Sequence, residues 1–238
     1  MLSFIRKHQY AERPGLCFLT GEAGVGKSRL SYELQKKLDH PHKINWISTE
    51  ADQILKKPLN PFVKFLRKYF NCRLNQDEQT GLRNFENGFN ALLEQSKIYW
   101  PEIKEELNRL HSTYLAILDF KTDKDSVYSR LNAEEKYNSV IKAFTTFFRL
   151  QSKIHPTIIF LDDAQWIDKN SKDFIVKLLQ EVSDSTLIIF FALRPDGIDK
   201  PKEFLNIQQL ARPVAILEID LDPLNTSGII AFTSEMLG

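Results

Sequence analysis

The sequence predicts an α/β fold, a three-layer αβα sandwich around a central parallel sheet of about five strands. Short apolar runs rich in strand-forming residues alternate with segments of helical spacing, which is the order expected of parallel strands joined by crossover helices. A glycine-rich turn follows the first apolar run, and two adjacent carboxylates follow the third. The 238 residues suffice for one large domain, or for a domain and a fragment of another.

Five apolar runs are predicted to form the strands of this sheet. The fourth run has almost no alternation between apolar and polar residues, so we expect it to be a central strand that is buried on both faces. The runs span residues 16–20, 44–48, 157–161, 186–193 and 214–219.

The hundred or so residues between the second and third runs are predicted to form a helical insertion, residues 52–153. Apolar residues recur there at helical spacing, and we expect their aromatic rings in the core rather than on a base-stacking surface. The two clearest stripes are Leu59, Phe62, Val63, Leu66, Tyr69 and Phe70, and then Tyr137, Val140, Ile141, Phe144, Phe147 and Phe148.

Residues 21–28 fit the pattern G-x-x-x-x-G-K-[ST] directly after an apolar run, and this pattern predicts a phosphate-binding loop and a P-loop NTPase fold. Glycines let successive N–H groups turn towards a phosphate, and the helix expected to begin at Ser28 adds its positive end. Lys27 is predicted to contact the β- and γ-phosphates, and Ser28 to offer its hydroxyl to Mg²⁺. A glycine-rich turn without a ligand is the alternative. The predicted ATP-binding residues are Gly21, Glu22, Ala23, Gly24, Val25, Gly26, Lys27, Ser28 and Arg29.

Three further residues are predicted to complete the site from the ends of other strands. Asp162 and Asp163 follow an apolar run, as in a Walker B motif, and parallel strands present their carboxyl ends to the ligand. We expect Asp162 to hold Mg²⁺ opposite Ser28 and Asp163 to orient or deprotonate the attacking water. Arg194 directly follows the fourth run and is predicted to reach the γ-phosphate. The alternatives are acids that cap a turn and an arginine on the surface.

Charge and cysteine content limit the partners and the compartment. The chain has 32 basic and 31 acidic residues, a net charge of +1, so no global field attracts nucleic acid or an anionic membrane. Nucleic-acid contact is therefore not expected, although residues 56–73 are locally basic. No apolar stretch approaches 18 residues, which argues against a membrane span. Cys17 and Cys72 are the only cysteines, and we expect a reducing, cytoplasmic setting.

The segment Phe160-Leu161-Asp162-Asp163-Ala164-Gln165-Trp166-Ile167-Asp168 resembles the "L-D-D-x-x-W-x-D" signature of AAA-like signal-transduction ATPases with numerous domains (STAND). Residues 21–30 are similar to the phosphate loop of that group, residues 60–67 to its "P-F-x-x-x-L-R" helix, residues 192–195 to its sensor arginine, and residues 221–224 to its "L-x-P-L". The resemblance implies an ATP-binding, Mg²⁺-dependent and slow ATPase that acts as a regulatory switch. It also implies effector or sensor domains outside this chain and ATP-dependent self-association.

Two departures from the family pattern shape the expected domain organisation. The family's G-R-x-x-E segment, which helps to hold adenine, is not found before the first strand, so we expect an incomplete adenine pocket and weakened ATP affinity. We expect residues 1–221 to form the ATPase core and residues 222–238 to begin a truncated helical lid.

Three other functions stay open at this point. A DNA-associated AAA-type ATPase, of the origin-binding or helicase-loading kind, would need a basic groove and a winged helix. A nucleotide or small-molecule kinase would use the same phosphate loop with an arginine-bearing lid. A nucleotide-binding scaffold without turnover would keep only the binding residues.

Overall fold

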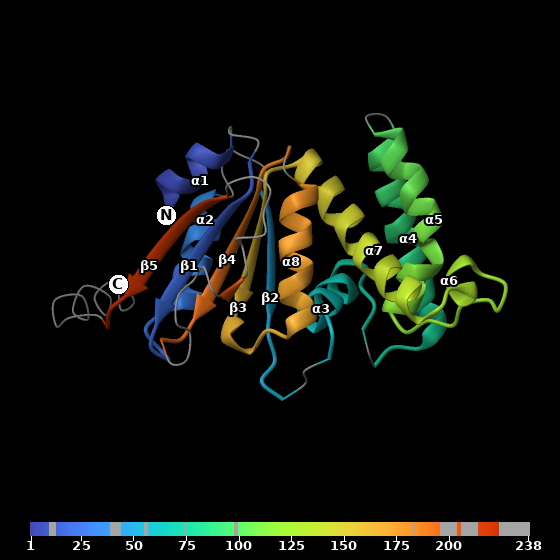
Figure 1. The fold of residues 1–238 in the computed structure, drawn as a ribbon, viewed down its shortest axis with the longest axis horizontal. Helices are drawn as coiled ribbons and strands as arrows, with labels where there is room; N and C mark the ends of the chain where they lie inside the picture. The colour runs from blue at the N-terminus through green and yellow to red at the C-terminus, as the bar shows by residue number, and fades with distance from the viewer. Residues whose placement is uncertain are drawn as a thin grey trace.

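The computed structural model describes residues 1–9, 13–38, 44–54, 57–73, 75–97, 100–182, 184–195, 204–205 and 214–223. Its elements alternate along the chain much as the sequence predicts (Figure 1). In chain order they are α1 (Leu2–Gln9), β1 (Gly15–Gly21), α2 (Lys27–Leu38), β2 (Asn45–Glu50), α3 (Asn60–Tyr69), α4 (Glu78–Lys97), α5 (Pro101–Ile117), α6 (Val127–Arg130), α7 (Ala133–Ile154), β3 (Thr157–Asp162), the 3-10 turn η1 (Ala164–Trp166), α8 (Lys169–Glu181), β4 (Leu187–Leu193) and β5 (Ala215–Leu221).

The five strands form one parallel sheet in the order β2-β3-β4-β1-β5. Each predicted run supplies one strand, with ends that differ by one or two residues. All seven residues of β4 are buried, so the prediction of a central strand is confirmed. Since β4 lies between β3 and β1, the carboxyl ends of these three strands are neighbours at one edge of the sheet, the lower edge in Figure 1.

Alternate residues of the strands belong to two separate hydrophobic cores, because successive side chains point to opposite faces of a strand. On one face Cys17, Ile158 and Phe190 pack with Ile5 of α1 and Leu34 of α2. The other face packs against α3, α7 and α8, and its strand residues include Phe18, Ile47, Ile159, Leu161, Ile189 and Phe191. The sheet therefore lies between two helical layers, which confirms the predicted αβα sandwich.

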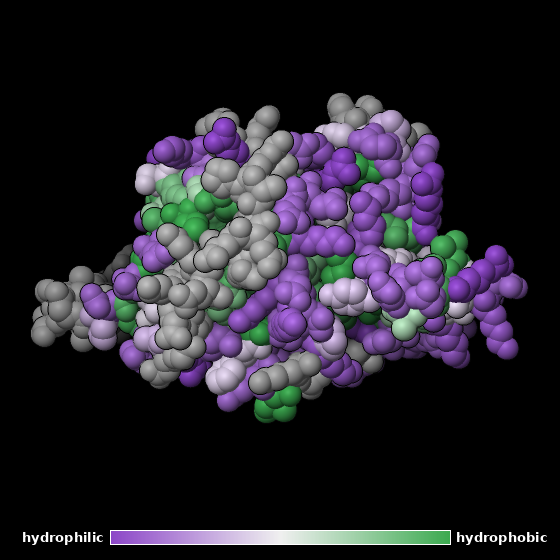
Figure 2. Space-filling model, in the orientation of Figure 1, coloured by the Kyte–Doolittle hydropathy of each residue, from purple (hydrophilic) through white to green (hydrophobic). Residues whose placement is uncertain are grey.

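The helices between β2 and β3 form a lobe that packs on the sheet through α3 and α7, while α4 to α6 lie beside the sheet (Figure 1). Within it, α5 packs on α7 and α4 packs on α5. Phe62 contacts the rings of Phe144, Phe148 and Phe174 in edge-to-face geometry, with centroids 4.7–6.0 Å apart. This cluster joins the lobe to α8, and hydrophilic side chains cover the outer face of α8 and the lobe (Figure 2).

The aromatic residues of the two predicted stripes are buried in the core, as predicted, with two exceptions. Tyr69 and Tyr137 are 36% and 40% exposed. Tyr69 is the last residue of α3 and packs edge-to-face on Phe147 of α7, with ring centroids 4.8 Å apart, whereas Tyr137 lies in the second turn of α7. Their place in the stripe predicted burial, and this prediction was wrong for the two tyrosines.

No helix among the described residues is both long enough and apolar enough to cross a membrane. Most of the predicted lid segment, residues 224–238, lies outside the described residues, so the lid stays a prediction.

Candidate functional site

The loop of residues 21–28 joins the end of β1 to the start of α2. Gly24 and Gly26 have φ values of +79° and +102°, which an L-residue adopts only with strain. Gly21 is required for a different reason, because a Cβ there would lie 2.8 Å from Cγ1 of Val25 and 2.9 Å from the carbonyl oxygen of Leu221. The glycines therefore allow a tight loop against β5, with the N-terminus of α2 behind it.

The Lys27 ammonium lies over this loop and donates to the carbonyl oxygens of Gly21 at 2.7 Å and Glu22 at 2.9 Å. The residue is 9% exposed. Burial lowers the pKa of Lys27 below its usual value, while the nearby Asp162 and Asp163 carboxylates act in the opposite direction. Lys27 is thus a partly desolvated cation held at the mouth of the loop.

The Ser28 hydroxyl donates to Oδ2 of Asp162 at 2.7 Å. The other oxygen of this carboxylate, Oδ1, accepts from the backbone N–H of Asp163 at 3.0 Å, which fixes its orientation. A hydroxyl and a carboxylate are hard oxygen ligands of the kind that Mg²⁺ prefers. The two side chains present here therefore fit a magnesium ion beside the loop.

Asp163 begins a turn, and its carboxylate has other partners than that of Asp162. Its backbone is left-handed, with φ 49° and ψ 38°, a conformation that few residues other than glycine tolerate. Oδ1 of Asp163 accepts from Nε2 of Gln165 at 2.8 Å and lies 3.5 Å from Nη2 of Arg194. Arg194 reaches it because β3 and β4 pair in parallel register, with Leu161 opposite Phe191.

A cavity of about 250 Å³ collects most of the predicted residues. Three predicted loop residues do not line it: Gly21 and Val25 lie against each other, and Glu22 is exposed. The lining residues are Ala23, Gly24, Gly26, Lys27, Ser28, Arg29, Asp162, Asp163 and Arg194. The predicted catalytic, metal and phosphate-loop residues thus meet at one place, and their roles stay predictions.

Sequence reasoning gave no role to two residues beside this cavity, Gln165 and Glu50. In the sequence, Gln165 is only one position of the segment 160–168, and its contact depends on the turn at Asp163. Glu50 ends β2 opposite Asp162 and lines a second cavity of about 300 Å³, which also has Asp162 in its wall. The position of Glu50 could have indicated a role, because it is an acidic residue at the carboxyl end of a predicted parallel strand.

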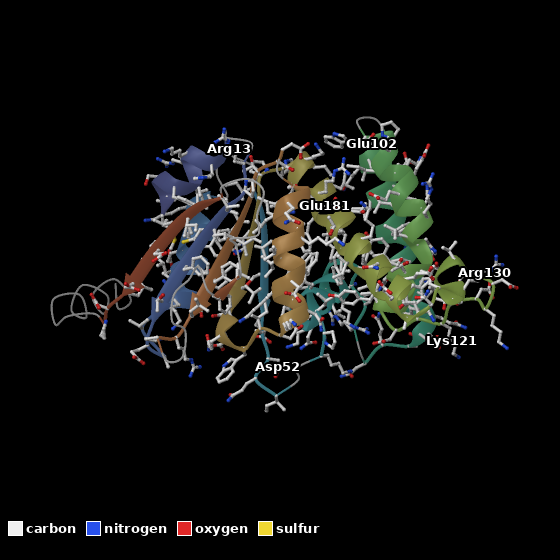
Figure 3. All side chains as sticks on the ribbon, in the orientation of Figure 1. Arg13, Asp52, Glu102, Lys121, Arg130 and Glu181 are labelled. Atoms are coloured by element: carbon white, nitrogen blue, oxygen red, sulfur yellow. The ribbon has the colours of Figure 1, made fainter. Side chains whose placement is uncertain are left out.

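The locally basic segment is partly neutralised in the fold. Nζ of Lys64 lies 3.3 Å from Asp52 and 3.4 Å from Glu50, and Arg67 pairs with Asp119. Asp52 follows β2 at the same edge of the sheet as the cavity (Figure 3). Two of the basic side chains of the segment, Lys64 and Arg67, are therefore paired with carboxylates.

Comparison with known proteins places the chain in a family. The model of the AAA ATPase domain matches residues 7–190. No protein with a curated description matches the chain. Similar solved structures include Drosophila ORC bound to DNA, with 15% identity and a TM-score of 0.42 over 94% of this chain and 40% of that one.

Two other solved structures are similar at low scores. A STAND protein with a tetratricopeptide repeat sensor from Pyrococcus horikoshii has 13% identity and a TM-score of 0.36, over 97% of this chain and 24% of that one. VirB4 of Thermoanaerobacter pseudethanolicus has 11% identity and a TM-score of 0.32, over 94% of this chain and 81% of that one.

The chain spans less than half the length of the first two of these structures. The assignment therefore rests on the family model, which covers more than half of the chain and includes the loop, the two aspartates and the turn after them. On this match, the chain belongs to the AAA ATPase domain family.

Proposed function

We propose that this chain is a Mg²⁺-dependent ATPase whose nucleotide state controls a signalling or regulatory assembly. The observation that carries the proposal is the hydrogen bond between Ser28 and Asp162, which joins the phosphate loop to the strand-end carboxylates at the wall of one cavity. A P-loop ATPase needs this juxtaposition, since one side chain from each segment holds the metal that bridges the β- and γ-phosphates.

The binding part of the proposal assigns the triphosphate to the loop of residues 21–28. Backbone N–H groups around Gly24 and Gly26 and the N-terminus of α2 would hold the phosphates. Lys27 would turn from the carbonyl oxygens of Gly21 and Glu22 to the phosphate oxygens, which are stronger acceptors. Ser28 and Asp162 would hold Mg²⁺, which neutralises developing charge on the phosphates.

The turnover part assigns the attacking water to Asp163 and the γ-phosphate to Arg194. Asp163 lines the cavity next to Asp162 but points its Oδ1 towards Gln165 and Arg194, so the two acids serve different ligands. The Arg194 side chain is 43% exposed and its 3.5 Å pairing with Asp163 is weak, so it can exchange this partner for a phosphate oxygen.

The regulatory part rests on the resemblance of residues 160–168 to the STAND signature. In such a protein the ATPase reports nucleotide state to sensor or effector domains, and self-association follows ATP binding. The free, buried thiols of Cys17 and Cys72 support a reducing cytoplasmic setting.

The binding of a fluorescent ATP analogue tests the proposal. Lys27→Ala should abolish binding, because it removes the cation that faces the β- and γ-phosphates. Lys37→Ala, at an exposed position in the last turn of α2, is the matched control and should bind as the wild type does. Unchanged binding of the analogue by Lys27→Ala would contradict the assignment of the triphosphate to residues 21–28.

A further inference from the structure

The turn after β3 brings Gln165 back against Asp163. The left-handed backbone of Asp163 starts η1, in which the N–H of Trp166 donates to the carbonyl oxygen of Asp163 at 3.0 Å. Ala164 and Ile167 are buried in the core and anchor the turn on both sides of Gln165. Gln165 is therefore held at a fixed distance from the carboxylate two residues before it.

The orientation of the Gln165 amide is set by chemistry. Nε2 donates to Oδ1 of Asp163 at 2.8 Å, and the flipped amide would bring two acceptor oxygens together. Its own Oε1 is buried and finds no hydrogen-bond partner in the described part of the chain. An unpaired buried acceptor destabilises a fold, whereas an apolar side chain of the same length would avoid this cost. The amide is thus explained by its contact with Asp163 rather than by stability.

The two oxygens of the Asp163 carboxylate differ in their hydrogen-bond partners. Oδ1 has two donors, Gln165 at 2.8 Å and Arg194 at 3.5 Å, and among the described residues none hydrogen-bonds to Oδ2. Once Arg194 turns to a phosphate oxygen, Gln165 is the donor that still holds Oδ1. Gln165 does not line the cavity itself, so it acts only through Asp163.

We propose that Gln165 is a positioning residue for ATP hydrolysis, which fixes Asp163 so that Oδ2 is the oxygen that receives the proton of the attacking water. This inference rests on the proposed function. In the step, the water oxygen bonds to the γ-phosphorus while the bond from that phosphorus to the β,γ-bridging oxygen breaks, and its electron pair leaves with ADP. The water proton passes to Oδ2 of Asp163 and then to solvent.

Two substitutions test this role. Gln165→Met keeps the length of the side chain and removes the donor, so it should lower kcat for ATP by about 10- to 100-fold, the usual effect of a misplaced catalytic group. ATP affinity should stay within about 2-fold, since no ligand of the phosphates is touched. The unfolding midpoint should be equal or higher, because the unpaired Oε1 is gone. Gln79→Met, at an exposed position in the first turn of α4, is the control.

Gln165→Glu supplies a readout that a merely structural role would not move. The new side chain keeps the size of glutamine but has no donor, and its carboxylate repels that of Asp163, so kcat should fall further than in Gln165→Met. In an Asp163→Asn background, Gln165→Glu should cause no further loss of kcat, because the group that Gln165 positions is already gone. Wild-type kcat in Gln165→Met, or an equal loss from Gln165→Glu with Asp163 present and with Asp163→Asn, would overturn the inference and leave the proposed function standing. If the wild type binds no ATP analogue and releases no phosphate, the proposed function fails and the inference fails with it. If Gln165→Met does not fold, the comparison of Gln165→Glu in the two backgrounds decides alone.

Discussion

Ser28 and Asp162 are 134 residues apart in the chain, and the hydroxyl of the first donates to the carboxylate of the second at 2.7 Å. The helical lobe of α3 to α7 lies between them in sequence but packs on or beside the sheet in space (Figure 1). The contact arises because β1 and β3 are parallel and both end at the same edge of the sheet, with β4 between them. The fold thus brings together two local motifs that the whole helical insertion separates in sequence.

Removing the Ser28 hydroxyl should lower the affinity for Mg²⁺ strongly and the stability of the fold only slightly. Ser28→Ala deletes one of two protein groups that fit Mg²⁺, and we expect the apparent Mg²⁺ affinity in the presence of ATP to fall about 10- to 100-fold. Stability should change by less than about 1 kcal/mol, since the hydrogen bond is exposed to solvent. A Mg²⁺ titration of ATP binding measures the effect. Ser28→Thr keeps the hydroxyl and should behave as the wild type does; equal affinities for all three proteins would refute the assignment.

Cys17 should not react with thiol reagents in the folded protein. Burial raises the pKa of its thiol to about 12, so at about pH 8 only about one thiol in 10⁴ is ionised. Cys72 is also buried, with a raised pKa. An absorbance assay with a disulfide reagent should detect no fast thiol in buffer and both thiols in concentrated urea. A rapid reaction of the folded protein would show that this core opens.

The same thiol makes stability depend on pH. In the folded protein Cys17 keeps its proton between pH 9.0, the ordinary pKa of the thiol, and about 12. The unfolded chain loses that proton in this window and therefore binds fewer protons, so the free energy of unfolding falls as pH rises through it. Urea unfolding of Cys17→Ala and wild-type protein over this range should show a smaller pH slope for the variant.

Phe62 should contribute strongly to the free energy of unfolding, because it joins the lobe to the core. It is 1% exposed and contacts three other phenylalanine rings, one of them Phe174 of α8. Phe62→Ala should lower the free energy of unfolding by about 3–5 kcal/mol. Tyr137→Ala removes an aromatic ring that is 40% exposed in the same lobe and should cost far less. Equal losses in urea unfolding would contradict this account of the core.

The strands and the loop were predictable because their signals are local. The unbroken apolar run at residues 186–193 indicated a central strand, and from that position Arg194 was expected at the phosphate site, where it lines the same cavity as the loop. Its pairing with Asp163 was not predicted. The contact of Gln165 with Asp163 could not be predicted, since it depends on one left-handed residue that no periodicity reveals. Helical spacing likewise places Tyr69 and Tyr137 on apolar stripes but does not say how much of each ring its neighbours cover.

Phosphate release from Mg²⁺-ATP by the wild type and by Asp163→Asn tests the central claim most directly. The account predicts steady release that requires Mg²⁺ in the wild type, and a fall of at least about 100-fold in Asp163→Asn with binding of the ATP analogue retained, because the amide cannot accept the water proton. Wild-type protein that binds the analogue but releases no phosphate would instead describe a nucleotide-binding scaffold. That result, or equal rates for the two proteins, would contradict the claim that these residues form a hydrolytic site.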